Sequence, residues 1–211
     1  FVVTECSANS NGGDGIIVGV SCTVQNCSSS ANTLNGFTVN NGTTIQHCAA
    51  LNNRNNGFLL SAIGAAIANC AAVANIQNGI QAGGSCSVTD CTASSNFLDG
   101  ILVTSNCVVR GNSCSLNGQS PTVGAGVHAT GQFNRIEGNS CLGGDHGVRT
   151  DGNGNIIIGN TCGSNTQNWT IAPNNLFGEI VDRTAPGSAA VNGNAAPGTL
   201  ATTDPNANIS H

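Results

Sequence analysis

Residues 24–39 read VQNCSSSANTLNGFTV and residues 45–60 read IQHCAALNNRNNGFLL, so one motif returns after 21 positions. In both segments an aliphatic residue is followed by Cys, then by Asn, and then by Gly and Phe. A fixed period of about 20–50 residues is typical of repeat proteins, in which each unit stacks on the next. The fold is therefore best predicted from the positions that recur.

Three columns of recurring residues run through most of the chain. A Gly followed by an apolar residue returns in steps of 21, 21, 22, 21, 26 and 21 residues. In the later repeats Asn takes the Cys position, and Cys moves two residues on. The columns are Gly15, Gly36, Gly57, Gly79, Gly100, Gly126 and Gly147; Cys6, Cys27, Cys48, Cys70 and Cys91; and Asn11, Asn32, Asn53, Asn75, Asn96, Asn117 and Asn165.

The short apolar alternation after each Gly predicts strands. Side chains alternate between the two faces of a strand, so Phe37 and Val39 point inward while Thr38 points outward. A period near 21 suits a coil of three short strands separated by turns. We therefore predict an all-β chain: a right-handed parallel β-helix of about eight coils over residues 1–172. Residues 173–211 lose the period and form an irregular tail, a cap or an inter-subunit segment, with Leu176 and Phe177 covering the last coil.

The Asn and Cys columns have structural explanations. Asn tolerates left-handed backbone at a sharp bend, and stacked amides bond from coil to coil. Inward Cys packs as a small hydrophobe, and parallel side-chain vectors suit a disulfide poorly, so mostly free thiols are expected. Cys86 and Cys107 share one turn position on adjacent coils, and the sequence leaves undecided whether they form a disulfide. The Cys form no CxxC pairs and have no His column, so no metal or cofactor is predicted.

Composition excludes several classes of function. Charged residues make up 7% of the chain, the net charge is −5, and the five cationic side chains are scattered Arg. A nucleic-acid surface needs clustered cations, so no nucleic-acid partner is expected. No apolar run reaches the length of about 18 residues that a transmembrane segment needs. The chain opens in a strand-like run at Phe1, as a mature chain or a fragment would.

The repeats resemble the right-handed parallel β-helix superfamily of pectate lyases, polygalacturonases and phage tailspikes, and above all secreted bacterial β-helix repeat proteins. The resemblance lies in segments 24–27, 35–39 and 156–162 and in the tail at 182–185 and 203–205. It implies the fold and leaves the activity open. Lyases of this superfamily use an Arg or Lys base with acidic residues, and polygalacturonases use clustered Asp with His and Arg-x-Lys. The chain has no Lys, so the second pattern fails.

One polar cluster is a candidate site. His128 lies one coil below Arg149, while Asp145 and Asp151 stand at opposite ends of one strand, roughly 20 Å apart if it is extended. Glycoside hydrolysis needs two carboxylates facing each other across roughly 5–10 Å. The sequence therefore favours a solvated surface over an active site. The cluster consists of His128, Glu137, Asp145, His146, Arg149 and Asp151, and a surface ion pair between Arg110 and Glu137 is expected.

Two functions remain open, beside a third reading as a tailspike-like fragment that would form trimers. The long regular coils, low charge and lack of a catalytic cluster favour a non-catalytic extracellular protein, a filament subunit or adhesin stalk that self-associates head to tail or laterally. The alternative is a polysaccharide-active lyase or hydrolase, or a carbohydrate-binding module, with a groove beside the insertion at 117–126. Either protein would be extracellular or at the cell surface. The sequons at Asn26, Asn41, Asn168 and Asn208 would permit glycosylation.

Overall fold

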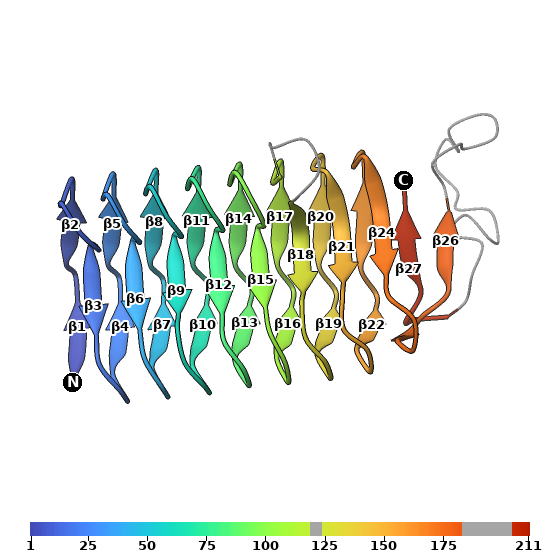
Figure 1. Ribbon diagram of the computed structural model, residues 1–211, viewed down its shortest axis with the longest axis horizontal. Coiled ribbons are helices and arrows are strands. Elements are labelled where there is room, and N and C mark those ends of the chain that lie inside the picture. The colour runs from blue at the N-terminus through green and yellow to red at the C-terminus, as the bar shows by residue number, and fades with distance from the viewer. Residues whose placement is uncertain (119–123, 183–203) are drawn as a thin grey trace, which may run out of the picture.

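A right-handed parallel β-helix forms the body of the protein (Figure 1). The structure, a computed structural model, describes residues 1–118, 124–182 and 204–211. Every regular element in these ranges is a β-strand, and the strands form three parallel sheets, here called A, B and C. The five-residue insertion at 119–123 lies outside the described residues. All-β, parallel and built from coils, the architecture confirms the predicted fold class.

Sheet A contains the first strand of each coil, which carries the Val or Ile column. It has nine strands, each aligned with the strand one coil away. They are β1 (Val2–Thr4), β4 (Thr23–Gln25), β7 (Thr44–Gln46), β10 (Ala66–Ala68), β13 (Ser87–Thr89), β16 (Val108–Arg110), β19 (Arg135–Glu137), β22 (Ile156–Ile158) and β25 (Leu176–Phe177).

Sheet B follows after a single corner and has ten strands. Its outward side chains are mostly Ser, Thr and Ala, and none of them carries a charge before the last strand, β26. The strands of sheet B are β2 (Ser7–Asn9), β5 (Ser28–Ser30), β8 (Ala49–Leu51), β11 (Ala71–Val73), β14 (Thr92–Ser94), β17 (Ser113–Ser115), β20 (Ser140–Leu142), β23 (Thr161–Gly163), β27 (Asn208–Ser210) and β26 (Ile180–Asp182).

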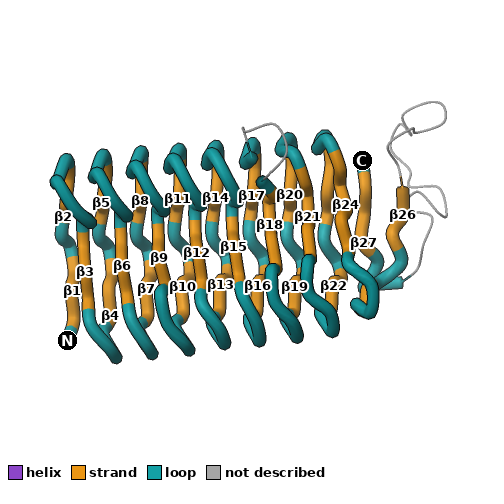
Figure 2. The backbone as a smooth tube through the Cα atoms, in the orientation of Figure 1, coloured by secondary structure: helices purple, strands orange, loops and turns teal. Residues whose placement is uncertain are grey.

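Sheet C closes each coil and has eight strands, which run side by side along the rod (Figure 2). Its last three strands are five residues long, whereas the earlier ones have three. The strands of sheet C are β3 (Ile16–Val18), β6 (Phe37–Val39), β9 (Phe58–Leu60), β12 (Ile80–Ala82), β15 (Ile101–Val103), β18 (Ala125–Ala129), β21 (His146–Thr150) and β24 (Gln167–Ile171).

The register of stacking follows the columns of the sequence. Val24 pairs with Val3 on one side and with Ile45 on the other, and Phe37 pairs with Phe58. The alignment survives the longest step, since Ile101 pairs with Val127 across the insertion. Identical positions therefore lie above one another along the whole rod.

Stacked aliphatic and aromatic side chains fill the interior. Phe37 and Phe58 are fully buried, with ring centroids 4.7 Å apart and planes at 12°. The central Val or Ile of each sheet A strand is also fully buried from Val24 to Ile157. Each such side chain contributes about 1.5–3 kcal/mol relative to exposure, and only when the next coil covers it.

An amide ladder runs through the corner between sheets B and C. The amide of Asn53 donates to Asn75 Oδ1 at 3.0 Å and to the Ser29 carbonyl, while its own oxygen accepts from the backbone and side chain of Asn32. These amides are almost wholly buried, and the bonds satisfy both ends of each one. The same donor-to-acceptor pattern joins Asn11, Asn32, Asn53, Asn75, Asn96 and Asn117.

The sequence predicted a left-handed backbone at the ladder Asn residues. In the structure the residue just before each of them has the left-handed backbone instead. Ala31 and Asn52 have φ of 53°, and Leu116 has 54°. The corner turns at this position, and the following Asn only has to aim its amide along the rod. A single corner residue of any type bears the left-handed geometry once the ladder holds the bend.

Cysteine and asparagine serve the same bond at a second corner. The Cys27 amide N–H donates to Cys48 Sγ at 3.4 Å, and the Cys91 N–H donates to Asn112 Oδ1 at 2.9 Å. From there an Asn ladder takes over, which explains why Asn replaces Cys in the later repeats. It consists of Asn112, Asn139, Asn160 and Asn208.

Part of the predicted tail belongs to the stack. Strand β25 pairs with β22, and β27 pairs with β23, so strands continue beyond residue 172. Asn208 enters the second ladder through Asn160. Leu176 and Phe177 are 69% and 54% exposed, so they extend sheet A instead of covering the last coil as expected.

The eleven Cys are free thiols, Cys86 and Cys107 included, so no disulfide joins that pair here. Only Cys6 is exposed. We expect a thiol reagent to modify about one Cys per native chain and eleven per unfolded chain, because burial blocks the rest. Counting thiols before and after denaturation checks this. Two fewer after denaturation would mean that one disulfide had formed.

Replacing Asn53 by Ala removes four ladder bonds and leaves buried partners unsatisfied. We expect a loss of roughly 2–4 kcal/mol in the free energy of unfolding, measured by denaturant titration. Asn55→Ala, two positions away in the same turn, is the matched control and should change stability by less than about 0.5 kcal/mol. Equal effects would contradict a special role for the ladder.

Candidate functional site

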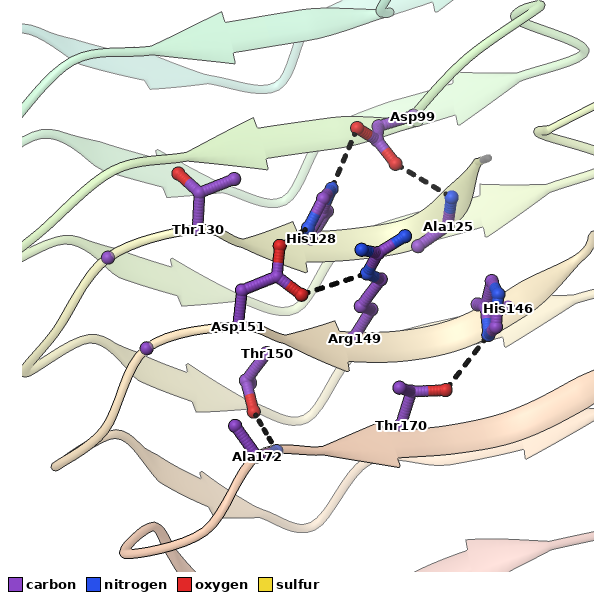
Figure 3. A network of polar contacts seen from close by, with 12 residues as sticks. Asp99, Ala125, His128, Thr130, His146, Arg149, Thr150, Asp151, Thr170 and Ala172 are labelled. Carbon is purple, nitrogen blue, oxygen red and sulfur yellow. Dashed lines mark hydrogen bonds and ion pairs between the residues drawn. The ribbon is translucent and has the colours of Figure 1, made fainter. Parts of the chain in front are cut away.

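The outward column of sheet C becomes polar where its strands lengthen. Leu102, His128, Arg149 and Thr170 occupy one register position on β15, β18, β21 and β24. Apolar or uncharged residues hold this position in every earlier coil. The change concentrates chemistry-bearing side chains on one part of the face, shown in Figure 3.

His128 lies between two carboxylates (Figure 3). Its Nδ1 is 3.0 Å from Asp99 Oδ2, and its Nε2 is 2.9 Å from Asp151 Oδ2. Carboxylates only accept hydrogen bonds when ionised, so both contacts are hydrogen bonds only if both ring nitrogens carry a proton. The geometry therefore fits the imidazolium form. The ring is 8% exposed, which limits its access to water.

Asp99 reaches His128 because it ends a third ladder, in the turn before sheet C. Asn35 donates its amide to Asp14, Asn56 to Asn35 and Asn78 to Asn56, so the oxygens in this ladder face the following coil. Asp99 donates its backbone N–H to Asn78 Oδ1 and presents its own carboxylate to the next coil. There Oδ1 accepts the Ala125 N–H at 2.7 Å, and Oδ2 is left for His128.

Asp151 connects His128 to Arg149. Its Oδ1 is 2.9 Å from Arg149 Nε, while its Oδ2 contacts the imidazole. The side chains of Arg149 and Asp151 are 28% and 41% exposed, so this end of the network meets solvent. The Nε bond fixes the plane of the guanidinium and leaves its two terminal amino groups outside the ion pair.

The network shifts two pKa values in opposite directions. Burial alone would lower the pKa of His128, but hydrogen bonds and charge from Asp99 and Asp151 outweigh it and raise that pKa. Burial would raise the pKa of Asp151, but hydrogen bonds and charge from His128 and Arg149 lower it. Both shifts favour the charged forms, and the four side chains together carry no net charge.

This arrangement is poorly suited to acid–base catalysis. Both nitrogens of His128 are engaged, and Asp99 is 5% exposed with both oxygens bonded. A lowered pKa makes Asp151 a weak proton donor near neutral pH, whereas a glycosidase acid needs a raised one. The exposed and uncommitted donors belong to Arg149, which suits binding of an anion.

The other predicted residues separate into different places. His146 Nδ1 contacts Thr170 Oγ1 at 2.9 Å, on the same face as Arg149 (Figure 3). Glu137 lies on sheet A and pairs with Arg135 at 2.7 Å, a hydrogen bond that lowers its pKa. The expected pair with Arg110 is replaced by this contact, although Arg110 and Glu137 are aligned. Glu137 is therefore not part of the cluster.

A depression of about 490 Å³ lies at the corner that leads into β21 and β24. It forms where Gly144 takes the ladder position, because a side chain there would meet the Asn117 carbonyl. Asp145 lines it and directly precedes β21, four residues before Arg149, roughly 13 Å if this segment is extended. The other lining residues are Leu116, Asn117, Gly118, Gly143, Gly144, Ser164 and Thr166.

In two of the four sequons the Asn side-chain amide is hydrogen-bonded within the fold. The amide of Asn208 is wholly buried and donates to the Ile157 and Gly178 carbonyls, and the amide of Asn168 donates to Ser210 Oγ. A glycan on either nitrogen would displace these bonds, and glycosylation at these two positions stays a prediction. Asn26 and Asn41 are exposed, and their glycosylation stays a prediction.

Among residues 1–118, 124–182 and 204–211, no group of three or more His, Cys, Asp or Glu is placed to hold a metal ion. Nor does any helix of this described part have the length and apolarity needed to cross a membrane.

Sequence reasoning found three of the four network residues and missed Asp99. In the sequence Asp99 forms a turn dipeptide with Gly100, which does not distinguish it from the other turns. The available signal was its column, Asp14, Asn35, Asn56, Asn78 and Asp99, in which the last amide gives way to a carboxylate one coil before His128. Since a ladder amide donates and accepts, a carboxylate at its end leaves an oxygen for another donor.

No protein-family model and no curated protein sequence matches the chain. Solved structures do match. The A-module of Azotobacter vinelandii mannuronan C-5 epimerase AlgE4 superimposes with TM-score 0.73 and 18% identity, over 82% of this chain and 56% of that one. The AlgE6 A-module from the same organism gives 0.72 and 18%, over 100% and 57%. Pectate lyase Pel9A gives 0.59 and 17%, over 74% and 49%.

These comparisons confirm the resemblance to pectate-lyase-like parallel β-helices at the level of fold. The chain spans about half the length of each structure it matches. At such identities a shared fold does not transfer a site, so function has to be argued from this chain's own residues.

The raised pKa of His128 predicts a pH-dependent stability. Its contribution is complete below the ordinary His value of 6.5 and is lost as pH rises through the raised value. That of Asp151 is complete above 3.8 and is lost as pH falls through the lowered value. The cluster therefore stabilises most between these limits. We expect His128→Gln to cost roughly 1–3 kcal/mol at pH 5 and less at pH 9, measured by denaturant titration.

Arg135→Gln is the control for this experiment, because it breaks an exposed ion pair on sheet A. Its cost should stay below about 1 kcal/mol at both pH values. A loss for His128→Gln that is constant with pH would contradict an ionised role for the ring.

Proposed function

We propose that this chain is a polysaccharide-binding β-helix module that holds an acidic glycan on the widened part of sheet C, with Arg149 as the carboxylate-binding residue. The observation that carries the proposal is the solvent-facing Arg149–Asp151 ion pair, held from below by the buried residues Asp99 and His128. The same proposal puts the protein outside the cell or at its surface, where such polymers occur.

The structural neighbours support a polysaccharide ligand. Their names describe action on mannuronan and on pectate, and both of these polymers are built from uronic acids. A uronate carboxylate accepts two parallel bonds from a guanidinium, the geometry that makes Arg the usual partner of carboxylates. Asp145, Ser164 and Thr166 in the nearby depression offer hydrogen-bonding groups for sugar hydroxyls.

Binding is proposed in preference to cleavage. The two buried residues, Asp99 and His128, are hydrogen-bonded to one another. The lowered pKa of the exposed Asp151 leaves it ionised near neutral pH, without a proton to donate. A filament or stalk remains the second candidate, supported by the regular stacking of the coils. A binding module needs the same regular coils, so this feature does not distinguish the two functions.

The proposal predicts binding of polymannuronate or polygalacturonate oligomers to the folded chain, measured by isothermal titration calorimetry. Arg149→Gln should weaken binding by roughly tenfold or more, the value of a charge-assisted hydrogen bond. Arg54→Gln is the matched control, because it removes one exposed cation from a distant coil and gives the same net charge as Arg149→Gln.

Three outcomes would count against this function. They are the absence of binding by folded wild-type protein, equal binding of a neutral glucan, and equal losses in the two Arg variants. Release of unsaturated or reducing ends during the titration would show catalysis and overturn the preference for binding alone.

A further inference from the structure

We propose that Asp99 and His128 form a buried positioning pair that holds Asp151, and through it Arg149, so that acidic glycan binds well only while His128 is protonated. This inference rests on the proposed function for its ligand. Its structural part, the dependence of Arg149 on the charge of His128, stands independently and has its own measurement.

The pair is anchored at its buried end. Asp99 receives the Ala125 N–H on one oxygen and His128 on the other, and its backbone is tied to Asn78. The carboxylate therefore cannot turn away without breaking its hydrogen bond to the Ala125 N–H on the next coil. This fixes the Nδ1 side of the imidazole.

The exposed end is held by the same ring. Nε2 of His128 binds Asp151 Oδ2, and the second oxygen of Asp151 binds Arg149 Nε. Asp99 precedes β15, His128 lies on β18 and Asp151 follows β21, so one side chain joins three successive coils. Arg149 is thus oriented by a chain of bonds that begins at a buried carboxylate.

Deprotonation breaks that chain at a predictable place. A neutral imidazole has one N–H for two carboxylates, so one contact must lose its hydrogen bond. Asp99 is buried and has little water to replace its donor, whereas the side chain of Asp151 is 41% exposed. Nδ1 therefore keeps the proton and Asp151 is released. The four side chains then carry one net negative charge in place of none, which opposes an anionic ligand.

The titratable groups that face His128 come from both neighbouring coils. Asp99 approaches from the β15 side, where the aligned residue is the apolar Leu102. Arg149 and Asp151 approach from β21, whose first residue, His146, is bonded to Thr170. Asp145 precedes that strand. Uronate carboxylates stay ionised above a pH of about 5, so a change in binding near neutral pH would come from the protein.

The first test needs no glycan. We expect NMR titration of the His128 ring to give a midpoint about one pH unit or more lower in Asp99→Asn than in wild type, because the variant lacks the buried charge. An Asn at this position can still join the ladder as Asn78 does. The Arg149 Nε–H signal should respond to pH with the His128 midpoint in both proteins. Asp14→Asn, at the other end of the ladder, should leave the midpoint unchanged.

The second test measures affinity for a polyuronate oligomer from pH 5.5 to pH 9. Wild-type affinity should fall roughly tenfold across the His128 midpoint, and in Asp99→Asn the fall should move to lower pH with that midpoint. Affinity that is constant through the midpoint overturns the inference, as does an Arg149 signal that ignores it. If folded wild type binds no glycan at any pH, the proposed function fails, and the Arg149 response alone decides on the positioning pair.

Discussion

The hydrogen bond between the same position of successive coils is the constraint on which this structure depends. In the three sheets the backbone of in-register strands forms these hydrogen bonds, and at the corners the amide ladders form them. Because one coil cannot bury its own aliphatic residues, the packing of the core follows from this alignment. The 26-residue step shows that a corner tolerates extra residues while both flanking strands remain in register.

The candidate site is a local departure from that alignment. The ladders Asn11 to Asn117 and Asn112 to Asn208 point their amide nitrogens toward higher residue numbers, and the ladder that ends at Asp99 points its oxygens there. A carboxylate at the last position of such a ladder faces the next coil with a spare oxygen. His128 takes that oxygen, and the longer strands β18 and β21 provide the surface on which Asp151 and Arg149 follow. The candidate site thus differs from the regular repeat by only a few residues.

Much of the fold could be predicted from sequence because every coil repeats the same evidence. The Phe37–Phe58 and Val3–Val24 pairs follow from spacing alone. Features specific to one place were harder to predict. The left-handed corner was assigned to the Asn column because Asn tolerates that backbone better than the Ala31 or Leu116 that bear it. Asp99 was missed because its role depends on the direction of a ladder. Strands β25 and β27 follow no period, so no column announced them.

The direction of the ladders also makes the two faces of any coil chemically different. A ladder such as Asn11 to Asn117 presents oxygens toward lower numbers and amide protons toward higher ones, whereas the Asp14 to Asp99 ladder does the reverse. A coil moved elsewhere in the rod therefore fits if it keeps its orientation, and an inverted coil would set donor against donor. Duplication of whole repeats can lengthen such a protein without new packing solutions, and the polarity of its side-chain amides ensures that each added coil enters the same way round.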